Sequence, residues 1–179
     1  MSGLIGAVSV LALAGCASSS ALPDHSDVRT IEVQGVAGKL ATRSSSSAIT
    51  SSVTVPLEQV WRMLPGLFDS LGVPVALIEP AKHLIGNEGF KLRQRLGKVT
   101  LSRYMDCGTT QIGPNADSYD VYLTVLVQLQ PGANGTTSIA TSFESLARPI
   151  AFAQEYSRCS TKGLFETRLV ALVKAQLKG

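Results

Sequence analysis

The strongest constraint on the fold comes from residues 118–147, which read as two long strands with a turn between them. The flanking segments, SYDVYLTVLVQLQ and TTSIATSFESLA, alternate apolar and polar residues, as half-buried strands do because successive side chains point to opposite faces. The segment between them, PGANG, contains a Pro-Gly and an Asn-Gly pair, and such pairs favour turns. We therefore expect one long β-hairpin here.

Residues 56–72 place apolar side chains three and four positions apart, which is the spacing of one helix face. Pro56 suits the first turn and Gly72 suits the C-terminal cap. Pro65 lies inside the segment and is expected to kink the helix, because proline removes a backbone donor and crowds the preceding turn. The apolar face consists of Leu57, Val60, Trp61, Leu64, Phe68 and Leu71.

A second helix is predicted within residues 160–179, where a wide apolar stripe follows Ser160 and Thr161. Either of these two residues can cap the helix, because a side-chain hydroxyl accepts a hydrogen bond from a free N–H of the first turn. The stripe consists of Leu164, Phe165, Leu169, Val170, Leu172, Val173 and Leu177.

The remaining segments complete the predicted order of elements. Residues 48–55 and 90–96 alternate like strands, residues 73–80 read as a buried strand bounded by prolines, and residues 81–89 read as a turn-rich connection. The order strand, helix, four strands, helix predicts a single α+β domain over residues 48–179. We expect an antiparallel sheet of about four to five strands with two helices packed on one face.

The N-terminal residues are expected to be a targeting signal and not a membrane-spanning helix. Residues 3–15 are apolar and uncharged, but as a helix they reach only about 20 Å, less than the roughly 30 Å hydrocarbon core of a bilayer. A short apolar segment followed by small residues is typical of a signal peptide. The motif LAGC, residues 13–16, resembles the lipobox of bacterial lipoproteins. The resemblance implies a signal peptide at 1–15, cleavage before Cys16 and lipid attachment to the sulfur of Cys16.

The same resemblance implies a location, and it implies that the partner of the lipid anchor is a membrane. Ala17 follows the cysteine, whereas an Asp at this place resembles the signal for retention in the inner membrane. The expected location is therefore the outer membrane, with the chain anchored by its lipid and facing the periplasm. Residues 16–47 form a serine-rich tether, in which the alternating residues 29–36 suit a short edge strand. The alternative to a lipobox is that the N-terminal segment forms a buried helix in which Cys16 is inert.

Once Cys16 is assigned to the lipid, Cys107 and Cys159 remain. An exported domain meets oxidising conditions, so we expect these two residues to form a disulfide. A bridge closing a loop of this length stabilises a domain by about 4 kcal/mol. The alternative is a thiol enzyme in which one of them pairs with His83. The acidic neighbour Asp106 disfavours that alternative, because a nearby negative charge raises the pKa of a thiol.

The combination of lipobox, serine-rich tether and element order resembles the helix-grip domains of the BamC-type outer-membrane lipoproteins. The likeness covers residues 48–178 and depends on the order of elements rather than on a residue motif, so it assigns no functional residue. This chain also has one such domain where that family has two. The resemblance implies a helix-grip packing of helices against the sheet.

Several classes of chemistry are disfavoured by composition and spacing. With 16 basic and 13 acidic residues the net charge is only +3, far from the excess expected of a nucleic-acid-binding protein. The segment GVAGKL, residues 35–40, lacks the spacing of a phosphate-binding loop, and no Gly-x-Ser-x-Gly motif is present. His25 and His83 have no His or Cys partner at metal-ligand spacing. We therefore expect no cofactor, no metal and no nucleic-acid partner.

One candidate binding surface lies in FKLRQRLGK, residues 90–98. On a single strand Lys91, Arg93 and Arg95 would share one face, which makes a row of cations. Such a row can bind an acidic partner or the anionic headgroups of lipids. The alternative is an ordinary solvated strand face.

The second candidate is the polar, glycine-containing segment at residues 101–120, which is long enough for a functional loop. Its side chains Arg103 and Tyr104 are candidates for binding a partner or an anion. The alternative is structural: Cys107 fastens the segment to the region of the last helix, and Tyr104 caps the core.

These observations together predict a non-catalytic, lipid-anchored envelope protein with a structural or assembly role. It would bind a partner protein or another envelope component through the basic strand and the loop that contains Cys107. One alternative is a carrier of an apolar ligand or lipid, with a cavity between helix and sheet lined by Trp61 and Phe68. A further alternative is a cysteine-dependent enzyme.

Overall fold

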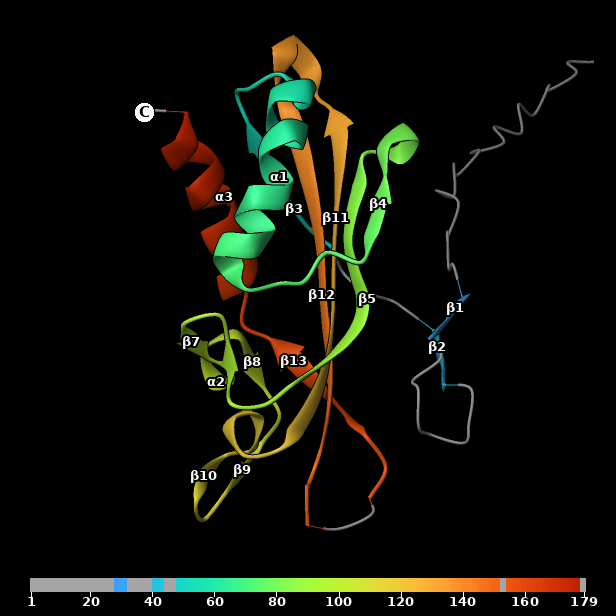
Figure 1. Cartoon of the computed structure of the whole chain (residues 1–179), viewed down its shortest axis with the longest axis vertical. Coiled ribbons are helices and arrows are strands. Elements are labelled where there is room, and N and C mark those ends of the chain that lie inside the picture. The colour runs from blue at the N-terminus through green and yellow to red at the C-terminus, as the bar shows by residue number, and fades with distance from the viewer. Residues whose placement is uncertain (1–27, 32–39, 44–47, 152–153, 178–179) are drawn as a thin grey trace, which may run out of the picture.

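The computed structural model describes residues 28–31, 40–43, 48–151 and 154–177. Its main body is an antiparallel sheet with two long helices against one face (Figure 1). The predicted α+β class with an antiparallel sheet is therefore confirmed. The predicted signal peptide at 1–15 and the predicted lipid-attachment residue Cys16 lie outside the described residues.

A long hairpin forms the centre of the sheet, as the alternating pattern predicts. Its strands are β11 (Asp120–Pro131) and β12 (Thr137–Arg148), each of 12 residues. They pair without interruption, from Asp120 opposite Arg148 at one end to Pro131 opposite Thr137 at the other. The short helix η3 (Ala133–Gly135) forms the turn between them.

Five further strands flank this hairpin: β3 (Ile49–Val53), β4 (Leu77–Glu79), β5 (Leu84–Leu92), β8 (Met105–Asp106) and β13 (Ser157–Thr161). Beside β11 lie β5 and then β4. Beside β12, β3 pairs with one end of the strand and β13 with the other, and β8 follows β13. Within the described residues the sheet thus has seven strands. The sequence pattern predicts fewer, because neither β8 nor β13 carries a long alternation.

The two long helices, α1 (Leu57–Leu71) and α3 (Leu164–Gln176), lie side by side on one face of the sheet (Figure 1). Helix α1 ends where the apolar spacing predicts, at Gly72, whose φ of 79° is the left-handed conformation common after a helix. Pro65 lies within α1 and does not end it.

The predicted cap of the last helix is wrong. Ser160 and Thr161 belong to strand β13, and α3 begins only after Gly163, which has a φ of 71°. The hydroxyl oxygen of Thr161 still accepts a hydrogen bond from the N–H of Gly163, at 3.1 Å. The polar residue therefore stabilises the turn before the helix, because pairing with Met105 of β8 holds it in an extended conformation.

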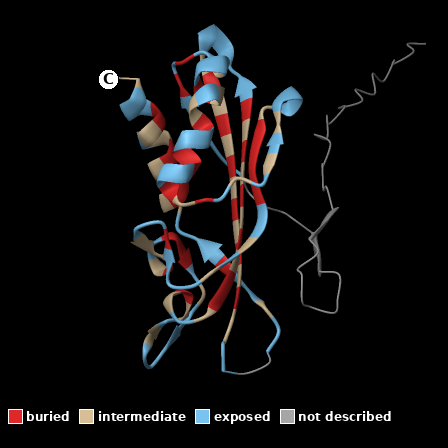
Figure 2. Ribbon diagram, in the orientation of Figure 1, coloured by how far each residue is buried: buried red, intermediate tan, exposed pale blue. Residues whose placement is uncertain are grey.

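Burial follows the alternation of the hairpin strands (Figure 2). Every second side chain of β11 and β12 is buried, and the buried ones pack with the apolar faces of α1 and α3 in one core. Most of the side chains between them are half-buried on the opposite face of the sheet, where Asp120 is buried and Gln130 is exposed. The hairpin contributes to this core Val121, Leu123, Val125, Val127, Leu129, Ile139, Phe143 and Ala147.

The turn-rich connection predicted at 81–89 is right only for its first residues, which form a 3-10 turn that ends at His83. The rest is wrong, because β5 begins at Leu84 and its first four residues are buried. Gly86 explains the misleading pattern. A Cβ at this position would lie 2.0 Å from the carbonyl oxygen of Val125, so glycine is required for β5 to approach β11, not for a turn. The strand predicted at 73–80 is also different from expectation: only its second half pairs, as the partly exposed edge strand β4.

The strand predicted at 90–96 is divided into two. Strand β5 ends at Leu92, and Gln94 then takes a φ of 64°. This left-handed conformation turns the chain away from the extended direction. The next residues form β6 (Arg95–Leu96), which pairs with β7 (Val99–Thr100) in a separate small hairpin. The predicted strand face is therefore interrupted after β5.

The smaller elements are β1 (Val28–Ile31), β2 (Leu40–Arg43), η1 (Pro80–Lys82), α2 (Leu101–Tyr104), β9 (Thr109–Thr110), β10 (Gly113–Pro114) and η2 (Asn115–Asp117). Strands β1 and β2 pair with each other inside the segment predicted as a tether. None of the helices in the described part of the chain is long and apolar enough to cross a membrane.

Candidate binding surface

The face of the sheet opposite α1 and α3 carries no helix in the described part of the chain (Figure 1). We call it the helix-free face. The strand register places on it alternate residues of β3, β11 and β12, whose side chains are mostly short and polar. Among them are Thr50, Ser52, Tyr122, Thr124, Gln128, Gln130, Ser138, Ser142 and Arg148.

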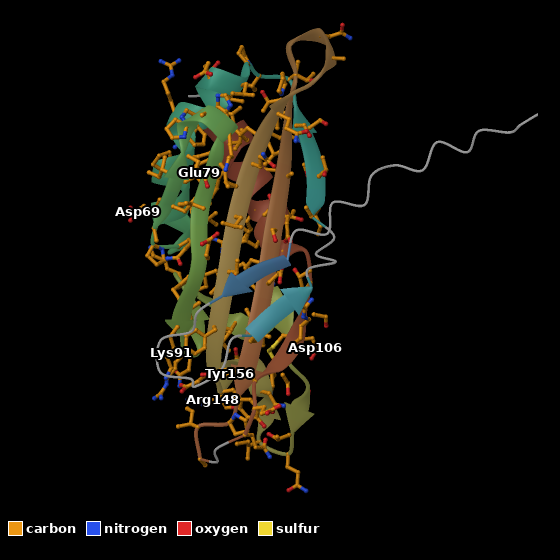
Figure 3. All side chains as sticks on the ribbon, turned by 90° about the vertical axis from the view of Figure 1, so that its right-hand side faces the viewer. Asp69, Glu79, Lys91, Asp106, Arg148 and Tyr156 are labelled. Atoms are coloured by element: carbon orange, nitrogen blue, oxygen red, sulfur yellow. A yellow bond between two sulfur atoms is a disulfide. The ribbon has the colours of Figure 1, made fainter. Side chains whose placement is uncertain are left out.

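Charged and aromatic side chains gather at the end of the helix-free face where β11 begins and β12 ends. Figure 3 shows three of them, Lys91, Arg148 and Tyr156, at this same end. We call the group the tyrosine–arginine cluster and define it as Lys91, Arg93, Asp120, Tyr122, Arg148 and Tyr156.

Asp120 is the anionic centre of the cluster. Its carboxylate accepts a hydrogen bond from Nε of Arg93 at 2.5 Å and pairs with Nζ of Lys91 at 2.6 Å. The Asp120 side chain is only 6% exposed, whereas those of Lys91 and Arg93 are 43% and 57% exposed. The hydrogen bond from Arg93, with help from Lys91, lowers the pKa of Asp120 below its ordinary value although burial opposes the shift. The carboxylate is therefore ionised at neutral pH.

Two tyrosines and an arginine form the other half of the cluster. The rings of Tyr122 and Tyr156 meet edge to face with centroids 5.1 Å apart, and the guanidinium of Arg148 lies 4.6 Å from the centroid of Tyr156. Burial and the neighbouring Tyr122 raise the pKa of Tyr156 to about 12, so its phenol is neutral. The stacking is a cation–π contact, which holds the long arginine side chain in place. Arg148 also lies directly opposite Asp120 in the strand register.

The predicted row of cations is therefore only partly formed. Lys91 and Arg93 come together, but on the carboxylate of Asp120 rather than as free charges. Arg95 does not join them: it lies in β6, and its guanidinium donates to the carbonyl of Lys98 at 3.3 Å. The positive φ of Gln94 between them is the physical reason.

Of the two residues predicted to bind in the segment at 101–120, one is exposed and one is not. Arg103 is exposed on α2. Tyr104 is fully buried and packs against the rings of Phe143 and Phe165, so it is not available to bind a partner or an anion. The alternative, packing in the core, is what the structure shows. Its hydroxyl accepts a hydrogen bond from Arg168, which satisfies the polar atom inside the core.

The structure joins Cys107 and Cys159 by a disulfide, which links the segment before the β9–β10 turn to β13. His83 lies far from this bridge. Its carbonyl accepts a hydrogen bond from Leu129, whereas the register places Cys159 level with Leu123. These two leucines are six positions apart along β11, which is roughly 20 Å. The structure therefore does not bring the predicted cysteine–histidine pair together.

The side chains predicted to line a ligand cavity take part in packing. Phe68 is fully buried in the core cluster, and Trp61 is partly buried against the same cluster. The Trp61 ring also meets His83 edge to face, with centroids 5.5 Å apart, and Nε2 of His83 lies 3.1 Å from Oε1 of Glu58. These contacts place His83 at the end of the sheet beside α1, where it has a structural role.

Four residues of the cluster were not among the predicted site residues: Asp120, Tyr122, Arg148 and Tyr156. A signal exists for the first three, because their spacing on the predicted hairpin puts them on the polar face of the two strands. No pattern in the sequence indicates Tyr156. It reaches the cluster only because the chain returns to the sheet after β12.

The cluster can bind anions and pack against a second surface. Its guanidinium and ammonium groups supply hydrogen-bond donors, and its rings supply flat apolar area. Among the described residues, no group of three or more His, Cys, Asp or Glu side chains could hold a metal ion. No protein-family model matches the chain, and no curated protein matches it.

Proposed function

We propose that this protein is a non-catalytic, lipid-anchored lipoprotein of the bacterial envelope that binds a partner protein through its helix-free face. The anchor is Cys16, at the end of the motif LAGC, and the location is the periplasmic face of the outer membrane. Two or more acyl chains would hold the protein stably, because each buried methylene contributes about 0.8 kcal/mol. The serine-rich residues 16–47 would then connect the anchor to the folded domain.

The observation that carries the binding role is the contrast between the two faces of the sheet. One face is covered by α1 and α3, and the other carries no helix among the described elements. The helix-free face ends in a cluster that combines tyrosine and arginine, which are the residue types enriched at the energetic centres of protein interfaces. Further along the strands this face carries short polar side chains, among them Ser52, Ser138 and Ser142, which allow close approach of a second backbone or surface.

The arrangement of the helices supports an assembly role of the kind suggested by the BamC-type resemblance. In a helix-grip fold a long helix is held against a curved antiparallel sheet, and here α1 and α3 lie along the central hairpin (Figure 1). We propose that the domain is of this type. The role would then be structural, with the helix-free face as the contact region.

Metabolic labelling with a palmitate analogue in a bacterium with two membranes tests the anchor. The full chain should take up the label and fractionate with the outer membrane, and Cys16→Ser should abolish both. The matched control Cys159→Ser should keep the label, because it removes a cysteine outside the lipobox. Recovery of the full chain in the cytosol, with its initial methionine and no acyl mass, would refute the proposal.

Site-specific photo-crosslinking in the same cells tests the binding face. A crosslinker at Gln128, on the helix-free face, should give a discrete crosslinked band. A crosslinker at Ser70, exposed on α1, should not. Equal bands from both positions, or none from Gln128, would contradict binding through this face.

A further inference from the structure

We propose that the tyrosine–arginine cluster binds an acidic segment of the partner protein, so that carboxylates of the partner lie against Arg148, Lys91 and Arg93. This inference rests on the proposed function, since it names the chemistry of the same contact face. Its basis is a local surplus of positive charge. Among the described side chains of the cluster there are three cations and a single carboxylate, that of Asp120. Lys91 and Arg93 pair with this carboxylate, and Arg148 lies opposite it in the strand register.

The cations that pair with Asp120 keep donors for a second acceptor. A guanidinium has five N–H donors, and Arg93 uses its Nε on Asp120. Lys91 has three donors and likewise contacts one oxygen of that carboxylate. Because both side chains are about half exposed, a ligand carboxylate can reach them without breaking the pairs. Asp120 therefore positions the two cations while neutralising only one charge.

Arg148 extends the positive region to the other side of Asp120. It belongs to β12, whereas Lys91 belongs to β5, and β11 lies between these strands. Neighbouring strands are about 4.8 Å apart, so the two cations start roughly 10 Å from each other. An extended segment advances about 3.3 Å per residue, so acidic residues two to four positions apart can meet both. The Tyr156 ring under Arg148 preorganises the guanidinium for this contact.

The composition of the cluster favours a protein segment over an anionic membrane surface. Lipid surfaces are recognised by clusters of about four to eight Lys or Arg near one another. Here the cluster has three, with a carboxylate at their centre and two tyrosine rings beside them. Tyrosine and arginine together are typical of interfaces with proteins, where rings supply rigid contact area and guanidinium groups bind carboxylates with two hydrogen bonds.

Fluorescence anisotropy with the purified full chain in detergent micelles tests this inference, with a fluorescein-labelled peptide of ten glutamates as the probe. Arg148→Gln should weaken binding of the peptide by about fivefold, as expected for loss of one partly exposed charge pair. Arg103→Gln makes the same change of charge on an exposed arginine of α2 and should have less than about half that effect. Binding should also weaken with added salt.

Unfolding curves of both variants separate loss of binding from loss of folding, and Lys91→Gln provides a second variant within the cluster. Equal losses for Arg148→Gln and Arg103→Gln would overturn the inference. Glycerol 3-phosphate, the soluble part of an anionic lipid headgroup, should displace the peptide no better than free glutamate; preferential displacement would favour lipid and overturn it. If the peptide fails to bind while Cys16 is acylated, this inference fails and the anchor stands.

Discussion

The backbone of Gly72, at the end of α1, lies directly against that of Gly97 in the turn between β6 and β7. A Cβ at Gly72 would lie 2.5 Å from the amide nitrogen of Gly97. Both residues also have positive φ, 79° and 57°. The contact joins the end of the helix to the small hairpin that follows β5, and only glycine satisfies both the conformation and the space.

Gly72→Ala should therefore lower the free energy of unfolding by about 2–4 kcal/mol, through left-handed strain and overpacking. Gly66→Ala is the matched control, because Gly66 lies exposed inside α1 with no atom within 4 Å of an added Cβ. That variant should gain about 0.5–1 kcal/mol from helix propensity. Urea denaturation measures both changes, and effects of the same sign would contradict the packing described here.

Reduction of the bridge between Cys107 and Cys159, or replacement of both by alanine, should destabilise the domain by about 4 kcal/mol in the chain-entropy account, given their sequence separation of 52. Thermal unfolding with and without a reducing agent measures the loss. Thiol titration of the denatured, unreduced protein should find neither residue free. Two titratable thiols at these positions would show that the bridge does not form in the cell.

Asp120→Asn should reduce stability at pH 7 by about 1–2 kcal/mol, because Lys91 and Arg93 lose their charged partner. The hydrogen bond from Arg93 lowers the pKa of the folded carboxyl, so its contribution is present above the unfolded value, about 3.9, and is lost as pH falls through the folded value. The variant should therefore show a flatter decline of stability below about pH 4. Asp69→Asn, on the exposed surface of α1, should leave that decline unchanged.

Glu166→Met should stabilise the protein at neutral pH by about 1 kcal/mol. The Glu166 side chain is buried in the first turn of α3, and its Oε2 has no hydrogen-bond partner among the described residues, so its charge is costly to desolvate. Burial raises the pKa of this carboxyl despite the opposing effects of its own backbone N–H and of Thr161. A raised pKa means that stability falls as pH rises from the unfolded value, about 4.3, through the folded value. Urea midpoints of the two proteins between pH 4 and 8 should diverge, and parallel curves would contradict the assignment.

The parts of the fold that local patterns predict are those with long, regular periodicity. The hairpin of β11 and β12 and helix α1 follow from alternation and from three-and-four spacing, because the buried residues of each element recur at a regular interval along the sequence. Short strands such as β8 and β13 have too few residues for a period to appear. Gly86 suggests a turn for a related reason. The glycine is required because the backbone of Val125, which is distant in sequence, lies against it.

By itself, the sequence determines the α+β class, the main hairpin, the first helix with its glycine cap, and the polar character of one sheet face. Only the tertiary structure decides that Tyr104 is buried, that Lys91 and Arg93 meet Asp120, and that Tyr156 supports Arg148. Periodicity is a property of neighbouring residues, whereas these contacts join segments more than twenty residues apart or separated by a turn. A charge or a ring acquires its role from the partner that the fold brings to it.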